Sequence, residues 1–113
     1  MRLETTVLGH PLRAELTPLD DGLHVLLTGG CRTHVGAVTL AEPGCPPRTL
    51  LRQSHRDDVL STRWATALAD AHQAPVCVAC GVHYDNATPG QIRTITAASD
   101  DLLRLALERL KSE

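Results

Sequence analysis

Short runs of alternating hydrophobic and polar residues fill the first half of the chain, and this pattern predicts β-strands. We expect strands at residues 3–8, 12–16, 23–28 and 34–41, with a short fifth strand at 49–52. Glycine, proline and aspartate separate these runs, as turns and loops require. Within the fourth strand, alternation is expected to place four residues on one face: His34, Gly36, Val38 and Leu40.

The pattern changes near residue 57, where hydrophobic residues begin to recur every three or four positions. This period predicts a helix, with Trp64 packed against the sheet and with Arg56 and Asp57 outside the apolar stripe. A nearly unbroken apolar run at 76–82 then predicts a strand that is buried on both faces.

A second helical region begins at Pro89 and continues to the end of the chain. Thr88 can cap it, Pro89 suits its first position, and Gln91 stands where the partner in a capping box belongs. The polar triplet 99–101 could cap a fresh helix, so one kinked helix and two short helices both fit the pattern.

The order of elements is therefore five strands, a helix, a strand and a helix. This order predicts an α+β fold in one domain over residues 1–113, with a largely antiparallel sheet of about six strands and both helices on one face. The strands are too apolar to leave the other face in water, so we expect a second subunit to cover it in a two-fold homodimer.

Composition excludes several classes of function. The net charge is −2, and the chain has one Trp, one Tyr and no Phe, which gives neither a basic surface nor stacking platforms for nucleic acid. No apolar run approaches the roughly 20 residues of a membrane span. The first residues lack the pattern of a signal peptide, so we expect a cytoplasmic protein.

Four cysteines, Cys31, Cys45, Cys77 and Cys80, raise the question of disulfides or a metal site. Without a secretion signal, disulfides are not expected. The spacing of Cys77, Cys80 and His83 is similar to that of zinc ligands, but residues three apart in a strand point to opposite faces. We therefore interpret the cysteines as small buried hydrophobic residues, with a Cys/His metal protein as the alternative.

Two polar clusters interrupt the apolar pattern, at residues 29–36 and 83–88. If the strands that carry them are antiparallel neighbours, both clusters lie at one edge of the sheet, and His34 and His83 face one pocket. Gly29, Gly30 and Gly36 would let a ligand approach the backbone. Arg32, or the backbone N–H groups after Thr88, could bind a phosphate.

Each cluster also has a purely structural interpretation. Asp85 and Asn86 are typical of an Asx turn, and the two glycines at 29–30 are typical of a hairpin turn. His83 and Asp85 could form an oriented base, but no serine or cysteine stands at an obvious position to be activated, and the chain has none of the familiar catalytic motifs. We therefore expect a protein that is not an enzyme.

The two clusters carry a resemblance to a known family. The stretch from Gly29 to Val38, with two glycines followed by HVGAV, and the stretch GVHYDNATPGQI from Gly81 to Ile92 resemble the LpdD-like small D subunits of gallate-type decarboxylases. The resemblance covers most of the chain and implies a fold similar to that of the proteasome assembly chaperones. The residues for which the resemblance implies a functional role are His34, Gly36, His83, Asp85 and Asn86. The segment Cys31-Arg32-Thr33 and the cysteine-rich strand depart from the family pattern, which keeps a redox or metal role open.

What the resemblance implies is a non-enzymatic chaperone that binds prenylated FMN and helps to mature or deliver it to a UbiD-type decarboxylase. Flavin rings often stack on aromatic side chains, and here only Trp64 and Tyr84 could serve. Two alternatives remain: an assembly factor that holds a partner protein without any small ligand, and a small metal-binding protein.

Overall fold

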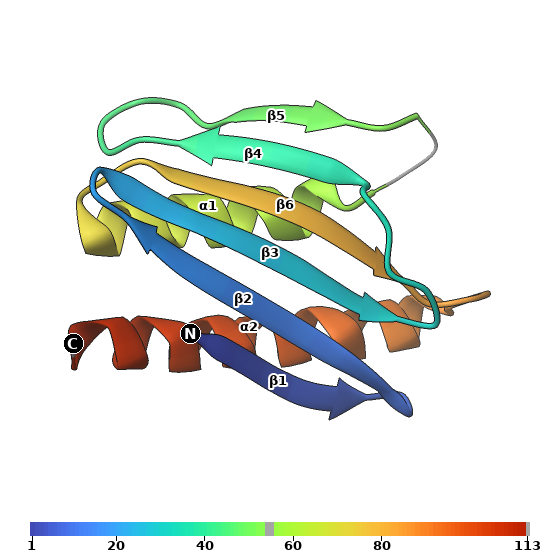
Figure 1. Cartoon of the computed structure of the whole chain (residues 1–113). Coiled ribbons are helices and arrows are strands. Elements are labelled where there is room, and N and C mark those ends of the chain that lie inside the picture. Colours follow the sequence, from blue (N-terminus) through green and yellow to red (C-terminus); the bar gives the residue numbers. More distant parts are fainter. Residues whose placement is uncertain (54–55, 113) are drawn as a thin grey trace.

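The computed structural model describes residues 1–53 and 56–112, which form one mixed sheet with two helices on one of its faces (Figure 1). The strands are β1 (Arg2–Val7), β2 (His10–Leu19), β3 (Gly22–Gly30), β4 (Ala37–Ala41), β5 (Arg48–Leu51) and β6 (Val76–His83). The helices are α1 (Asp58–His72) and α2 (Pro89–Lys111). The prediction of a largely antiparallel α+β sheet with two helices is confirmed.

The strand order in the sheet is β1-β2-β3-β6-β4-β5. Neighbouring strands are antiparallel except for β3 and β6, which run parallel because α1 lies in the crossover that leads back into the sheet. β6, the last strand in the sequence, therefore lies between β3 and β4. This insertion brings the ends of three strands together, and the polar clusters lie there.

The observed strand bounds differ from the predicted ones by one to three residues, and the structure also decides the form of the second helical region. The fourth strand begins at Ala37 rather than at residue 34, because residues 31–36 leave the ladder to cross the end of β6. The second helical region is one continuous helix, since Ser99 is buried in its middle and accepts a hydrogen bond from the Trp64 indole at 2.8 Å. Ser99 therefore joins the two helices and does not cap a new one.

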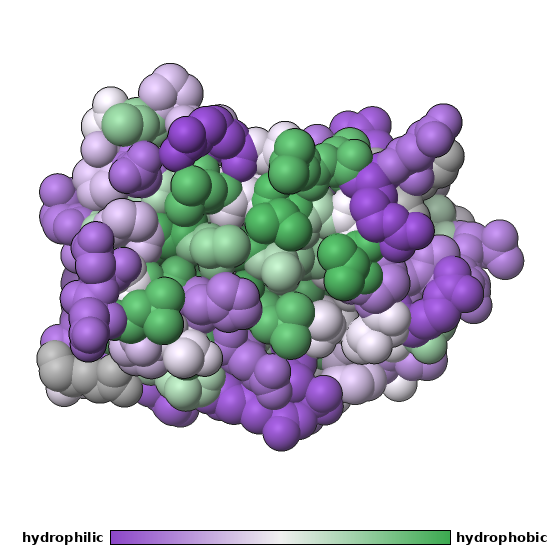
Figure 2. Space-filling model, turned by 45° about the horizontal axis from the view of Figure 1, so that its top comes forward, coloured by the Kyte–Doolittle hydropathy of each residue, from purple (hydrophilic) through white to green (hydrophobic). Residues whose placement is uncertain are grey.

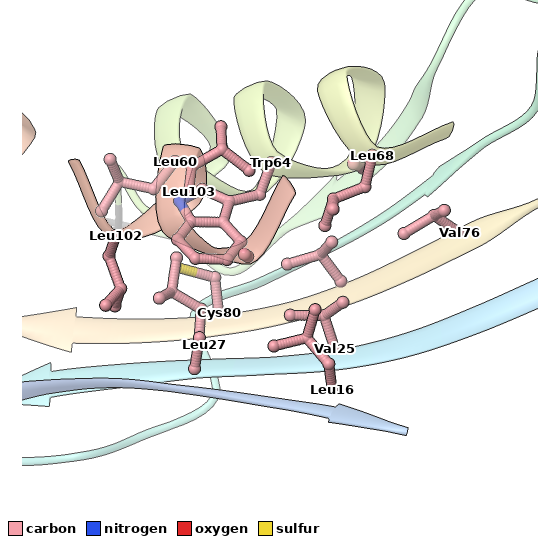
Figure 3. Close-up of a cluster of buried hydrophobic side chains, with 14 of the residues drawn as sticks. Leu16, Val25, Leu27, Leu60, Trp64, Leu68, Val76, Cys80, Leu102 and Leu103 are labelled. Carbon is pink, nitrogen blue, oxygen red and sulfur yellow. The ribbon is translucent and has the colours of Figure 1, made fainter. Parts of the chain in front are cut away.

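The core lies between the sheet and the helices (Figure 3). Trp64 points from α1 toward the strands and is fully buried, which confirms its predicted role as an anchor. Alternate strand residues supply the other wall of this core, among them Leu16, Val25, Leu27, Val76 and Cys80. Buried hydroxyl groups also connect α1 to the edge of the sheet, because Thr39 is 2.8 Å from Ser61 and 2.7 Å from Thr49.

The predicted capping box is present at the start of α2. The Thr88 side chain accepts a hydrogen bond from the Gln91 N–H, and the Gln91 side chain accepts one from the Thr88 N–H. Cys77 and Cys80 point to opposite faces of β6, as expected from strand alternation, and Cys80 is buried. In the part of the chain that is described, neither helix is long and apolar enough to cross a membrane.

The face of the sheet opposite the helices is uncovered. Figure 2 views this side obliquely and shows hydrophobic side chains gathered in its middle, with hydrophilic ones around them. The strand residues that point this way include Leu40 and Leu50, which are 38% and 80% exposed. One sheet therefore has a buried face and an exposed apolar face.

We expect Ser99→Ala to lower the free energy of unfolding by about 1–3 kcal/mol, because the buried Trp64 N–H would lose its acceptor. Urea denaturation checks this value. Ser112→Ala is the matched control, since the Ser112 hydroxyl is exposed and bonds only the Glu108 carbonyl of its own helix. A Ser99→Ala protein as stable as this control would show that the indole hydrogen bond does not stabilise the helix pair.

The thiols should also differ in reactivity. Burial, and then the neighbouring Asp57 carboxylate, raise the pKa of Cys80 well above its ordinary value, so the reactive thiolate does not form near neutral pH. With iodoacetamide, mass spectrometry should find the exposed Cys31 and Cys45 modified in the native protein, and Cys80 modified only in urea. Equal labelling of Cys45 and Cys80 in the native protein would contradict the buried position of β6.

Candidate functional site

The two polar clusters meet at the carboxyl end of β6. The connection at residues 31–36 leaves β3, crosses β6 and enters β4, and two backbone hydrogen bonds hold it there. The Cys31 N–H donates to the His83 carbonyl at 2.7 Å, and the Gly36 N–H donates to the Cys80 carbonyl at 2.9 Å. The expectation that antiparallel neighbouring strands bring the clusters together is met by β4 and β6.

Glycines make this crossing feasible. A Cβ at Gly81 would collide with the His34 carbonyl oxygen, and one at Gly36 would collide with the Asp57 carboxylate. Gly30 has φ +88°, and a Cβ there would meet the His83 carbonyl. The sequence suggested that glycines leave room for a ligand, whereas these three leave room for other parts of the chain.

Asp57 lies at the centre of the crossing. One carboxylate oxygen is 2.9 Å from His34 Nε2, and the other accepts the Val82 N–H at 2.9 Å. The side chain of Asp57 is 5% exposed, and that of His34 is 13% exposed. Because β4 pairs with β6 only as far as Cys80, the carboxylate takes the place of the missing strand partner for the Val82 N–H.

The two histidines face each other across the end of β6. The ring centroids of His34 and His83 are 6.0 Å apart, and the rings are nearly perpendicular at 80°. His83 Nε2 is 2.8 Å from the Asp85 carboxylate, which orients the ring. Each imidazole is thus positioned by its own carboxylate: Asp57 for His34 and Asp85 for His83.

A cavity of about 490 Å³ opens beside the two histidines, within the size range of small-molecule sites. Its walls come from the end of β6, the start of α1 and the first turns of α2. The apolar lining residues are Val59, Leu60, Val82, Ala87, Ile92 and Ile95, and the polar ones are His34, Arg56, Asp57, His83, Tyr84 and Thr96. The lining therefore suits a ligand with an apolar body and a few polar groups.

Tyr84 occupies one side of this cavity. Its hydroxyl donates to the Val7 carbonyl at 3.1 Å, and its ring is 5.9 Å from that of His10 in an edge-on arrangement. Burial, and then the nearby Cys31 thiol, raise the pKa of Tyr84, so the hydroxyl stays protonated and remains a donor. The ring is therefore held in place by β1 and β2.

The predicted site residues divide into two groups. His34 and His83 line the cavity, and Gly36 supports the crossing beneath them. Arg32, Asp85 and Asn86 are exposed and are not among its lining residues. Asn86 has φ +51°, which suits the turn that asparagine commonly forms.

The start of α2 offers few free donors for a phosphate. Pro89 has no N–H, and the Thr88 and Gln91 N–H groups are used within the capping box. The sequence had suggested either Arg32 or these N–H groups as the phosphate contact. Among the arginines, Arg56 lines the cavity and Arg32 does not.

Two of the polar lining residues that sequence reasoning missed are Asp57 and Arg56. Both were placed outside the apolar stripe of α1, yet Asp57 is buried. An aspartate just before a helix normally caps it, but the Asp57 side chain makes no cap hydrogen bond. No local signal in the sequence distinguishes a capping aspartate from one that reaches another strand.

The lining of the cavity suits the binding of a small molecule. Among the described residues that line the cavity there is no serine or cysteine to act as a nucleophile. Among residues 1–53 and 56–112, no group of three or more His, Cys, Asp and Glu side chains is arranged to hold a metal ion. The cavity instead combines apolar walls with oriented hydrogen-bonding groups.

Comparisons with known proteins agree with this description. Protein LpdD of Lactiplantibacillus plantarum is 27% identical over 109 residues, which cover 92% of this chain and 80% of that protein. A chain in the crystal structure of a novel chaperone complex for yeast 20S proteasome assembly shares the fold, with a TM-score of 0.55 and 16% identity over 99% of this chain and 95% of that one. The family model for the prenylated flavin chaperone LpdD-like domain matches residues 6–111. The chain therefore belongs to the LpdD-like chaperone family.

Proposed function

We propose that the protein binds prenylated FMN in the cavity between His34 and His83 and delivers it to a UbiD-type decarboxylase. The observation that carries the proposal is the convergence of two polar clusters, about 50 residues apart in sequence, on one apolar-walled cavity. The family to which the chain belongs is described as a prenylated flavin chaperone, which supports the choice of ligand.

The lining of the cavity fits the parts of such a ligand. A prenylated flavin has a flat polar ring system, an added apolar ring and a phosphate-bearing side chain. The apolar walls from α1 and α2 suit the added ring, and the two imidazoles can form hydrogen bonds with the flavin edge. Arg56 can pair with the phosphate, because the residue lines the cavity and its side chain is exposed.

Of the one Trp and the one Tyr in the chain, Tyr84 is the residue that can contact the flavin ring. Trp64 is fully buried in the core, so it cannot reach a ligand without unfolding part of the protein. Tyr84 lines the cavity, and its fixed ring offers an edge or a face to the flavin. The aliphatic side chains that line the cavity would supply most of the other apolar contacts with the flavin.

A carrier function requires binding that is reversible. The side chains known to line the cavity, from the described part of the chain, include no serine or cysteine, which suits a ligand that must leave unchanged. Its mouth carries exposed apolar groups on both helices, Val59 at 46% and Ile92 at 52% exposure. These groups lie where a receiving enzyme would have to approach, so they could contact the decarboxylase during transfer.

Reduced prenylated FMN should stabilise the protein in an anaerobic thermal-shift titration. A ligand that binds only the folded state adds about 2.7 kcal/mol at a hundredfold excess over its dissociation constant, which raises the midpoint by several degrees. FMN should bind at least tenfold more weakly, because each buried methylene that it lacks is worth roughly 0.8 kcal/mol. Equal midpoints with and without both flavins would refute the proposed site.

Variants locate the site. His83→Ala should weaken flavin binding at least about tenfold, which corresponds to one lost hydrogen bond to the ligand. His83 is partly exposed, so the variant should fold normally, and its midpoint without ligand checks this. His72→Ala is the matched control, since His72 is exposed in the last turn of α1, at the opposite end from the cavity. A weakened control would place the flavin elsewhere.

A second candidate is a ligand-free assembly factor, which the fold shared with a proteasome assembly chaperone and the uncovered apolar face of the sheet both favour. Activation of an apo-decarboxylase separates the two functions. Flavin-loaded wild type should activate the enzyme faster than the same amount of free reduced prenylated FMN, and His83→Ala should lose this advantage. If empty wild type and His83→Ala both assist the enzyme equally, the assembly factor is the better description.

A further inference from the structure

A cysteine and a histidine meet at the edge of the sheet where β2 begins and β3 ends (Figure 1). Cys31 directly follows β3, and His10 is the first residue of β2. The register of these antiparallel strands pairs Leu12 with Gly29, so its continuation places Cys31 opposite His10. Cys31 Sγ is 3.6 Å from His10 Nε2, which is a hydrogen-bonding distance for sulfur. The fold thus joins a thiol and an imidazole that are 21 residues apart in sequence.

Backbone and ring contacts hold both members of this Cys31–His10 pair in place. The Cys31 N–H donates to the His83 carbonyl at 2.7 Å. The His10 ring lies edge-on to the Tyr84 ring, with 5.9 Å between their centroids. The Tyr84 hydroxyl is in turn fixed by the Val7 carbonyl at 3.1 Å. A nucleophile, a base within its reach and a third group that orients the base are the parts of an activated cysteine.

Cys31 is also open to reagents in the surrounding solution. The sequence predicted small buried cysteines, which is correct for Cys80 but wrong for Cys31 and Cys45, since both of these are exposed. His10 is partly buried, because its ring packs against Tyr84 while Nε2 faces the thiol. A reactive cysteine requires access as well as a neighbouring base, and Cys31 has both.

The surroundings of the pair restrict the chemistry that it can support. Acyl transfer needs backbone N–H donors for the oxyanion, and the N–H of Cys31 already donates to the His83 carbonyl. A metal ion needs more ligands, and within residues 1–53 and 56–112 no group of three or more His, Cys, Asp and Glu side chains could hold one. A small oxidant requires neither feature, because it reacts directly with an accessible thiolate.

We propose that Cys31 is an oxidation site at which hydrogen peroxide converts the thiol to a sulfenic acid, with His10 as the base. This inference stands apart from the proposed flavin site, since neither residue lines the cavity. His10 Nε2 takes the thiol proton, and the sulfur attacks one oxygen of the peroxide. The S–O bond forms as the O–O bond breaks, and the released hydroxide takes the proton from His10 and leaves as water. Sulfur is oxidised and the peroxide is reduced, so the step needs no further reactant.

The other three cysteines lie away from this site, so the product should remain a sulfenic acid. Cys45 lies in the loop between β4 and β5, at the opposite end of the strands (Figure 1). Cys77 is near the start of β6, whereas Cys31 bonds the last residue of that strand. Cys80 is buried in the core. An intramolecular disulfide with Cys31 would therefore require the fold to open.

Peroxide treatment of the native protein tests the site. The wild type is treated with hydrogen peroxide in the presence of dimedone, which traps sulfenic acids, and mass spectrometry follows Cys31 and Cys45 separately. Cys31 should react at least about tenfold faster, since general-base assistance commonly contributes about a hundredfold or more. Cys45 is the internal control, because it is also exposed but has no histidine as a hydrogen-bond partner among the described residues. Equal rates at the two cysteines would overturn the proposal.

The same measurement in urea separates the fold from the local sequence. Unfolding parts Cys31 from His10, so the rate at Cys31 should fall to that at Cys45. A difference that persists in urea would come from the residues next to Cys31 in the chain, and the proposal would be wrong.

His10→Gln should lower the rate at Cys31 to that at Cys45 in the folded protein, because glutamine stays polar but cannot take the thiol proton. Circular dichroism checks that the variant is folded. His24→Gln is the matched control, since His24 is exposed near the start of β3, at the opposite end of that strand from Cys31. This control should react as fast as the wild type. A folded His10→Gln protein with an unchanged rate at Cys31 would exclude His10 as the base and overturn the proposal.

Discussion

The carboxylate of Asp57 holds together the part of the molecule on which the site depends. β4 stops pairing with β6 at Cys80, and the Val82 N–H beyond that point would otherwise be left without a backbone partner. Asp57 accepts this N–H and at the same time contacts His34, so one side chain joins the start of α1, the end of β6 and the crossing connection. A buried unsatisfied N–H costs about 1–3 kcal/mol, which gives this contact a structural value apart from any ligand. The same contact fixes the ring of His34 at the cavity.

Much of the fold follows from local rules that the sequence displays directly. Strand alternation, the period of the two helices and the capping box at Thr88 each depend on residues that are close in sequence, and each agrees with the structure. The insertion of β6 between β3 and β4 could not be derived in this way, because strand order depends on how the α1 crossover packs. The start of β4 was misplaced for a related reason. Residues 34–36 have strand-like composition, but they cross over β6, and only its position reveals this.

In the candidate site, too, some residues could be identified from the local sequence and others only from the fold. His34 and His83 stand at the ends of apolar runs, where a polar residue is conspicuous, so the sequence could identify them. Arg56 and the aliphatic walls from α1 and α2 look in sequence like any solvent-exposed charge or helix core stripe. Their role appears only when α2 is placed against the start of α1. The glycines were noticed for the right property, close approach, but sequence alone cannot say whether the approaching group is a ligand or the chain itself.

The position of β6 explains how a chain of 113 residues can offer two separate surfaces. Alternate residues of a strand point to opposite faces, so Val82 contributes to the cavity on the helix side while Ala79 points to the uncovered face of the sheet. A partner packed on that face would leave the helices, and the cavity between them, uncovered. Binding at either surface could then occur without displacing the other, although both would stabilise the same central strand. The carboxyl end of β6 is paired with β3 as far as His83 and is joined to the start of α1 by the hydrogen bond from the Val82 N–H to Asp57, so a shift of this end would be resisted on both sides. The cavity is therefore built on a strand inside the sheet, which helps to keep His83 and Val82 in position for a ligand.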